Sequence, residues 1–280
     1  MSIARPLTMS PIFEDPATAE PSKCKSLKRQ DWIAGLDKGL ALMMCFGQEH
    51  SRLSATQVAQ LAGMARTAAR RYLLTLVHLG YVATDGKLYW LTPRVLRLSQ
   101  AYLSSSRLVR IAQPLLQRLA QGTGEGVYLS VLEGDQIVYI AYQGTHQNTG
   151  RLQQIGYMLG TLVPAHLTAA GMLLLALRPD ESLDHWLAHT EFKMLTVHSV
   201  TDRAQMRQRL LDVRLQGWAV SEQQLELQYR GIAVPVRDAR GNAVAALSIT
   251  SLLGKETADQ TCQRLLSVMS DTAAAMRNLV

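Results

Sequence analysis

The sequence has 280 residues, 48% of them hydrophobic, and a formal net charge of +7 at pH 7. This length and apolar content allow a substantial core and suggest two domains. No apolar run approaches the ~18 residues that a membrane-spanning helix needs, and the first residues lack the apolar core of a signal peptide. The composition argues against a membrane or secreted protein, and we expect a cytoplasmic one.

The positive charge is concentrated near the N-terminus. Residues 23–110 contain 14 Lys and Arg against 4 Asp and Glu, whereas residues 111–280 contain 14 against 15. Such asymmetry favours nucleic-acid binding by the first region and a different task for the second. The three cysteines are scattered and not at metal-ligand spacing, so we expect inert thiols.

The first elements predicted are a tail and a helix. Residues 1–27 contain four prolines and few large apolar groups, which predicts a disordered tail. From Asp31 the apolar residues recur at helical spacing, up to a stop at Gly47. We expect one buried face on this helix, formed by Leu36, Leu40, Met43 and Met44.

A winged helix-turn-helix is predicted over residues 28–91. A second helix begins at Ser54, whose hydroxyl can cap the first turn while Gln57 reaches back. Gly63 permits a turn into a third helix, and residues 80–89 have the pattern of a hairpin. The expected core face of the third helix consists of Ala65, Ala69, Tyr72, Leu73, Leu76 and Leu79.

Basic and small residues gather on the other side of the third helix, near its start. They can contact DNA phosphates and base edges. A lone basic cluster is more often a solvated face, but the capped helix, the turn and the hairpin around it favour DNA binding. The predicted DNA-binding residues are Ser54, Thr56, Arg66, Thr67, Ala68, Arg70, Arg71 and Lys87.

A linker helix is predicted at residues 92–105, because Thr92 can cap it and Pro93 suits its first position. Residues 106–280 mix helices and strands, as in an α+β sensor module. Pro235 is expected at an edge or bulge. The predicted elements are helices at 108–119, 166–177, 202–216 and 257–278, hairpins at 127–142 and 232–250, a polar loop at 144–150 and a short strand at 218–220.

Five segments, in order along the chain, resemble the IclR family of bacterial transcription regulators, in particular its branch governing aromatic-acid and β-ketoadipate catabolism. Two of them are Val163-Pro-Ala-His-Leu-Thr-Ala-Ala-Gly171 and Gln224-Leu-Glu-Leu-Gln-Tyr-Arg-Gly-Ile-Ala-Val-Pro-Val236. The others are at 35–42, 63–82 and 91–96, and the two quoted segments continue at 173–176 and 245–249. The resemblance implies a GAF-like mixed α/β effector-binding domain, assembly as a homodimer or tetramer and binding to a palindromic operator in double-stranded DNA.

The resemblance also implies an effector site between the sheet and the helix that begins near His166. The family's ligand-contacting positions fall here on Thr168, Ala169, Ala170, Ser221, Gly231, Ser248 and Thr250. N–H groups at a helix start and hydroxyls on a neighbouring strand would suit the carboxylate of a small organic acid. Without the resemblance, these residues could equally be a helix cap and ordinary strand positions.

Three cations could neutralise such a carboxylate or could be structural: Arg151, His166 and Arg230. We favour His166, which lies just ahead of the helix. Where the family pattern can carry an acid or a thiol, this chain has Ser221 and Gly231, which predicts a more open and less charged site.

These observations predict a ligand-responsive DNA-binding transcription regulator with neither a cofactor nor a metal. An architectural DNA-binding protein without an effector remains an alternative. So does an enzyme with a DNA-binding appendage, although the sequence has no G-x-S-x-G motif and no metal-ligand cluster. His185 and His189 are at a spacing that can chelate zinc, but an ordinary surface helix explains them as well.

Overall fold

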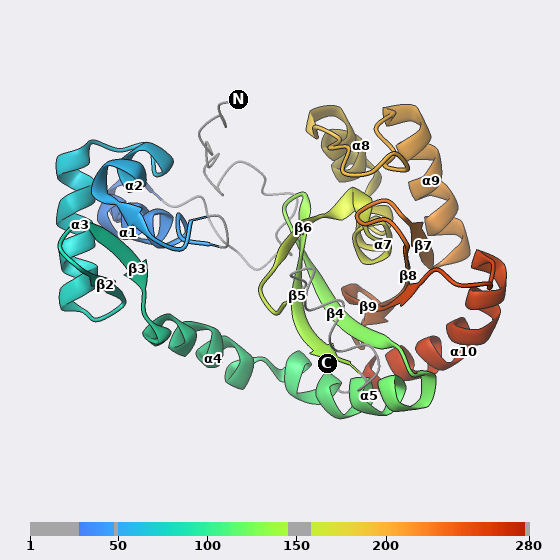
Figure 1. Cartoon of the computed structure of the whole chain (residues 1–280). Helices are drawn as coiled ribbons and strands as arrows, with labels where there is room; N and C mark the ends of the chain where they lie inside the picture. The colour runs from blue at the N-terminus through green and yellow to red at the C-terminus, as the bar shows by residue number, and fades with distance from the viewer. Residues whose placement is uncertain (1–27, 48–49, 145–157, 278–280) are drawn as a thin grey trace. The chain divides into compact units, whose positions relative to one another are not determined.

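The computed structural model describes residues 28–47, 50–144 and 158–277 (Figure 1). The tail expected at 1–27 and most of the loop expected at 144–150 lie outside these ranges. Contacts divide the chain into two compact units, with the division after Tyr102. Among the helices of the described residues, none combines the length and the hydrophobicity of a transmembrane segment.

The first unit is a winged helix-turn-helix, as predicted. Its three helices are α1 (Ala34–Met43), α2 (Ala55–Leu61) and α3 (Arg66–His78), preceded by a 3-10 turn at Arg29–Asp31. An antiparallel sheet of order β1-β3-β2 completes the unit, with β1 at Leu53–Ser54, β2 at Val82–Thr84 and β3 at Leu88–Leu91. The core contains Leu42, Leu53, Val58, Ala69, Leu73, Val82 and Tyr89.

The local signals around α2 are confirmed. The Ser54 hydroxyl accepts a hydrogen bond from the Gln57 N–H at 3.3 Å, and the Gln57 side chain accepts from the Ser54 N–H at 2.9 Å. This capping box satisfies two N–H groups that the helix itself cannot bond. Gly63, with φ of +61°, lies in the left-handed region and turns the chain toward α3.

The prediction of a buried leucine face on α1 is wrong. Leu36 and Leu40 are 62% and 49% exposed, and Met44 is also exposed. The side that meets α3 is formed by Gly35, Gly39 and the buried Leu42, since Cβ atoms on the two glycines would lie 3.7 and 4.0 Å from Tyr72. Small residues admit the bulky Tyr72, and the leucines therefore face outward.

Smaller differences from prediction concern ends of elements. Leu79 and Ala65, both expected in the core, are exposed because α3 runs only from Arg66 to His78. Thr92 caps the following turn by accepting from the Arg94 N–H at 3.3 Å. That turn is a 3-10 turn (Pro93–Val95), and α4 follows at Leu96–Ser105.

The second unit is a six-stranded antiparallel sheet covered by helices on both faces (Figure 1). The strand order is β6-β5-β4-β9-β8-β7. The strands are β4 (Gly126–Glu133), β5 (Gln136–Gln143), β6 (Leu162–Pro164), β7 (Ala219–Glu222), β8 (Tyr229–Arg237) and β9 (Ala243–Leu252). The helices are α5 (Arg107–Thr123), α7 (Ala169–Ala176), α8 (Asp180–His189), α9 (Arg203–Gln216) and α10 (Ala258–Arg277).

Two apolar layers lie on the two faces of this sheet. Helices α7, α8 and α9 contribute to one layer, together with Tyr128, Tyr139 and Ala233 from the strands. Helices α5 and α10 contribute to the other, together with Val127 and Leu129. Neighbouring strand residues therefore point to opposite layers, as strand geometry requires.

Both predicted hairpins are present, with small adjustments to the helices. β7 pairs with β8 only from Arg230 to Ala233, so Pro235 lies on a locally free edge, where no partner needs its missing N–H. The helix expected from His166 begins at Ala169, after a 3-10 turn at Ala165–Leu167.

Candidate functional site

The basic residues of α3 form an exposed surface near the start of that helix. Arg66, Thr67, Arg70 and Arg71 are exposed, and Ala68 between them is partly buried. None of these arginines makes an ion pair with another described residue. Their charge is therefore available to an anionic partner, and the small Ala68 allows close approach.

The other three predicted DNA-binding residues lie at the start of α2 and on the wing. Ser54 and Thr56 flank the first turn of α2, where the Ser54 hydroxyl is engaged in the capping box. Lys87 is exposed in the turn between β2 and β3. The Asp85 carboxylate fixes this turn by accepting from the N–H groups of Leu88 and Lys87 at 2.8 and 2.9 Å, contacts that lower the pKa of Asp85.

A cavity of about 50 Å³ lies in the second unit, between the start of α7 and the sheet. Seven of the eight predicted effector residues line it: Thr168, Ala169, Ala170, Ser221, Gly231, Ser248 and Thr250. The structure thus brings together residues from four separate segments of the chain. Their role in binding an effector stays a prediction.

Strand register explains the floor of the cavity. Ser221, Gly231, Thr250 and Gly126 lie directly opposite one another across β7, β8, β9 and β4. A Cβ on Gly231 would lie 3.5 Å from the Ala169 Cβ and 3.9 Å from its nitrogen. Because Gly231 has no side chain, space remains between β8 and Ala169, the first residue of α7.

The start of α7 offers hydrogen-bond donors to this cavity. Thr168 caps the helix by accepting from the Gly171 N–H at 2.9 Å. Ala169 and Ala170 are in the first turn of α7, so no carbonyl within the helix can accept a hydrogen bond from their N–H groups. Gly171 permits this tight turn, because a Cβ there would be 2.2 Å from the Ala165 oxygen.

Two serines are part of the polar lining, which also includes Gln224, Glu226 and Thr250. The Ser221 hydroxyl donates to the Leu167 carbonyl at 2.8 Å and is thereby occupied. Ser248 is only 5% exposed, and its hydroxyl has no hydrogen-bond partner among the described residues. Because Ser248 lines the cavity, its hydroxyl is free to hydrogen-bond a ligand or water there.

Tyrosine rings provide the apolar wall. Tyr128 and Tyr139 line the cavity, and their ring centroids are 5.1 Å apart. Tyr142 packs on Tyr128 at 4.7 Å. Burial raises the pKa of Tyr139 far above its usual value, so this phenol stays neutral. Such a wall suits a flat ring.

His166, the cation favoured from the sequence, does not line the cavity. The His166 Nε2 lies 3.3 Å from the Lys193 carbonyl oxygen, and its ring meets Phe192 edge-on at 5.3 Å. Burial lowers the pKa of His166, which favours the neutral imidazole. The side chain is a packed core histidine.

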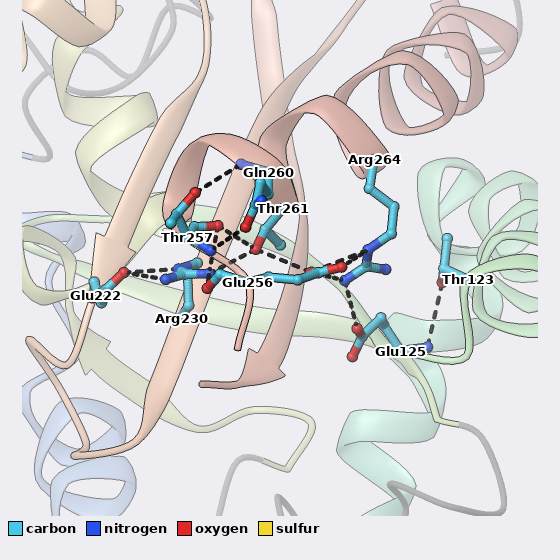
Figure 2. A network of polar contacts seen from close by, with 9 residues as sticks. All are labelled: Thr123, Glu125, Glu222, Arg230, Glu256, Thr257, Gln260, Thr261 and Arg264. Atoms are coloured by element: carbon cyan, nitrogen blue, oxygen red, sulfur yellow. Dashed lines mark hydrogen bonds and ion pairs between the residues drawn. The ribbon is translucent and has the colours of Figure 1, made fainter. Parts of the chain in front are cut away.

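Arg230 is structural, and Figure 2 shows why. Its side chain is 6% exposed and bonds the Glu222 carboxylate at 2.7 Å, the Thr261 hydroxyl at 2.6 Å and the Thr257 carbonyl at 3.0 Å. The network continues through Glu256 to Arg264 (Figure 2). Arg151, the third candidate, lies outside the described residues, and none of the described lining residues is Lys, Arg or His.

The network lies behind the floor of the cavity. Glu222 and Arg230 directly follow and precede the lining residues Ser221 and Gly231, so they point to the opposite face of the same strands. Glu222 and Arg230 are also directly opposite each other in the register. The ion pair therefore holds β7 against β8 at the level of the cavity.

Several lining residues were not predicted. They are Tyr128, Tyr139, Leu167, Gln224, Leu225, Glu226 and Tyr229. Gln224 to Tyr229 belong to a segment that carried the family resemblance, but the turn they form has no pattern of its own. Tyr128 and Tyr139 lay in predicted strands, and only the pairing of β4 with β9 places Tyr128 directly opposite Ser248.

Comparison with known proteins covers both units. Residues 35–86 match the IclR helix-turn-helix domain, and residues 100–278 match the bacterial transcriptional regulator IclR C-terminal domain. The Pca operon regulatory protein of Acinetobacter baylyi is 37% identical over 256 residues, 91% of this chain and 92% of that protein. The p-hydroxybenzoate hydroxylase transcriptional activator of the same species is 38% identical over 263 residues, 94% and 97% of the two chains.

A solved structure resembles the second unit. It is the inducer-binding domain of a double mutant of the PobR transcription factor from Acinetobacter, in complex with 3-hydroxybenzoic acid. The TM-score is 0.58 at 30% identity, over 61% of this chain and 98% of that one.

Proposed function

We propose that this chain, which belongs to the IclR family of bacterial transcriptional regulators, binds a small aromatic acid in the cavity beside α7. The family makes it a ligand-responsive, DNA-binding regulator. The ligand class is supported by the relative that activates p-hydroxybenzoate hydroxylase and by the inducer-binding domain that holds 3-hydroxybenzoic acid. Binding would change how the protein engages its operator.

The observation that carries this proposal is that the Ser248 hydroxyl, which has no hydrogen-bond partner among the described residues, lines the same cavity as the start of α7. A carboxylate can accept from the N–H groups of Ala169 and Ala170 and from Ser248, while its ring lies against Tyr128 and Tyr139. Donors at a helix start and a charge-assisted hydroxyl contact stabilise an anion without a basic side chain.

The cavity must enlarge to admit such a ligand. It measures about 50 Å³, whereas a cavity of roughly 150 Å³ accommodates benzene. The turn that bears Leu225 and Glu226 is flanked by Gln223 and Gln228, with φ of 53° and 67°. Left-handed residues other than glycine store strain. Outward movement of this turn would release that strain and open the cavity.

Operator binding would use the surfaces of the first unit. Arg66, Thr67, Ala68, Arg70 and Arg71 would enter the major groove, while Ser54, Thr56 and Lys87 would contact the backbone beside it. We also propose a homodimer or tetramer on a palindromic operator, because one such unit reads few base pairs. The exposed leucines of α1 offer apolar surface for assembly.

Calorimetry with the full chain tests the ligand class. We expect 3- and 4-hydroxybenzoate to bind and to raise the melting temperature, whereas the matched neutral amides should not. The proposal is wrong if no aromatic acid binds, and an architectural protein without an effector would then be favoured.

A variant separates ligand binding from operator binding. Ser248→Leu should abolish the ligand response, because the larger side chain fills the cavity, while it leaves affinity for a selected operator unchanged. Ser248→Ala is the matched control, because it removes the hydroxyl without filling the cavity. It should weaken ligand binding without abolishing it. Loss of operator binding by the folded Ser248→Leu protein without ligand would contradict separate sites.

A further inference from the structure

Arg52, which precedes β1, is stacked on an aromatic ring in the first unit. Its guanidinium carbon lies 4.4 Å from the centroid of the Trp90 indole. Arg52 is exposed and Trp90 is partly buried. Nothing in the winged helix-turn-helix pattern of the sequence singled out this pair.

Strand pairing places Arg52 on the outer face of the small sheet. Leu53 is opposite Tyr89 and Ser54 is opposite Leu88. Leu53 and Tyr89 are buried on the inner face, and side chains alternate along a strand. Arg52, Ser54 and Trp90 therefore share the outer face, beside the start of α2 and on the strand that leads out of the wing.

Arg52 makes no ion pair with any of the described residues. The exposed Asp85 carboxylate, whose pKa Arg52 helps to lower, attracts Arg52 without pairing with it. The stacked guanidinium thus keeps its charge available at the outer face.

A guanidinium that lies over an indole is suited to phosphate. A guanidinium that contacts the ring through its face keeps its in-plane N–H donors free for two parallel bonds to phosphate oxygens. The ring also restricts the side chain before binding, which lowers the entropy lost on association. In helix-turn-helix complexes the first helix of the motif crosses the DNA backbone, and here Arg52 adjoins that helix.

We propose that Arg52 binds a phosphate of the operator backbone and that Trp90 is the positioning residue that holds its guanidinium in place. The proposal rests on the DNA-binding function of the chain. It adds a phosphate contact, made by a residue beside the start of α2 and the wing. Because this contact does not involve a base, it should contribute to the binding of duplex DNA of any sequence.

Salt dependence of binding tests this assignment. Operator affinity of the full chain is measured by fluorescence anisotropy over a range of KCl concentrations, with an operator selected from random duplexes. Arg52→Ala should weaken binding roughly tenfold per protomer at about 0.1 M salt and reduce the slope of log K against log salt by about 0.9 per protomer. The same loss is expected with unrelated duplex DNA, whereas Arg52→Lys should keep the slope.

Trp90 variants test the positioning role. Trp90→Leu should weaken binding in the wild-type background and add nothing once Arg52 is alanine, because the two side chains act as a unit. Trp90→Phe, which keeps a ring, should restore most of the affinity. If Trp90→Leu weakens binding equally in both backgrounds, the positioning role is wrong.

Arg94 is the matched control. Its guanidinium stacks on Tyr81 at 5.5 Å beside Gly80, at the end of α3 opposite to Arg66. Arg94→Ala should leave the salt slope unchanged. If Arg52→Ala leaves the salt slope and the affinity unchanged, Arg52 does not bind a phosphate and this proposal is wrong. Binding of the operator by the wild type would still support the proposed function. Failure of the wild type to bind any duplex would overturn both.

Discussion

Gly231 offers a way to separate ligand binding from folding with one methyl group. In Gly231→Ala the new Cβ would stand 3.5 Å from the Ala169 Cβ and 3.9 Å from the Ala169 nitrogen, distances of ordinary van der Waals contact. The backbone at Gly231 is not left-handed, so alanine meets no strain there. Replacing glycine at a compatible position typically stabilises a protein by about 0.4–1 kcal/mol, through the unfolded state.

The same methyl group should weaken the ligand. It occupies the space between β8 and the first N–H groups of α7, where the proposed carboxylate would sit. Losing one charge-assisted hydrogen bond costs about 1.5–3 kcal/mol, which corresponds to a dissociation constant roughly 10- to 150-fold higher. Operator affinity without ligand should be unchanged.

The assays are calorimetry with hydroxybenzoates, urea denaturation and operator binding. Gly254→Ala is the matched control, since a Cβ there meets nothing within 4 Å. Unchanged ligand affinity in Gly231→Ala would refute the placement of the carboxylate between β8 and α7. A stability loss of more than about 2 kcal/mol would refute the argument that the methyl group fits.

Three further outcomes are expected. Arg70→Ala should weaken operator binding by about 1–3 kcal/mol in anisotropy titrations if Arg70 contacts a base, and unchanged affinity would remove it from the interface. Arg230→Met should lower the free energy of unfolding in urea by about 2–3 kcal/mol. This is less than the cost of breaking a fully buried ion pair, because the Glu222 side chain is 40% exposed. An unchanged free energy of unfolding would mean that the network in Figure 2 does not stabilise the fold. Burial lowers the pKa of His166 in the folded protein below its ordinary value of 6.5. As the pH falls through 6.5, the imidazole is therefore protonated in the unfolded chain before it is protonated in the folded protein, and the free energy of unfolding decreases. His166→Gln should show a smaller loss between pH 7 and 5, and an equal loss would exclude His166 as its source.

Local chemistry was sufficient for the winged helix-turn-helix. The capping box of Ser54 and Gln57 and the left-handed Gly63 involve neighbours in sequence, so each signal acts within its own turn. The same holds for the caps at Thr168 and Asp202. Such interactions form between neighbouring residues and do not require contacts with distant parts of the chain.

Helical periodicity predicted α1 but not the direction it faces. The spacing of its leucines indicated a buried stripe, whereas the structure turns Gly35, Gly39 and Leu42 toward α3. Periodicity shows that residues share a face, and it cannot show whether a partner for that face exists within the chain. The tertiary structure selected the glycine side because Tyr72 required the space.

The candidate cations His166 and Arg230 do not line the cavity, for a related reason. His166 and Arg230 lie next to lining residues in sequence, yet the first bonds the Lys193 carbonyl and the second pairs with Glu222 behind the sheet. Strand alternation and the 3-10 turn decide which side of the backbone each side chain takes. Adjacency in sequence carries no information about that choice.

The order of amino acids was enough to predict the winged helix-turn-helix, the basic surface of α3 and, through family resemblance, the segments that carry the cavity residues. The row in which Ser221, Gly231 and Thr250 face the start of α7 is visible only in the folded chain. That row depends on the register of β7, β8 and β9, and on how closely Gly171 lets α7 approach the turn before it. Both are set by contacts between residues far apart in the chain.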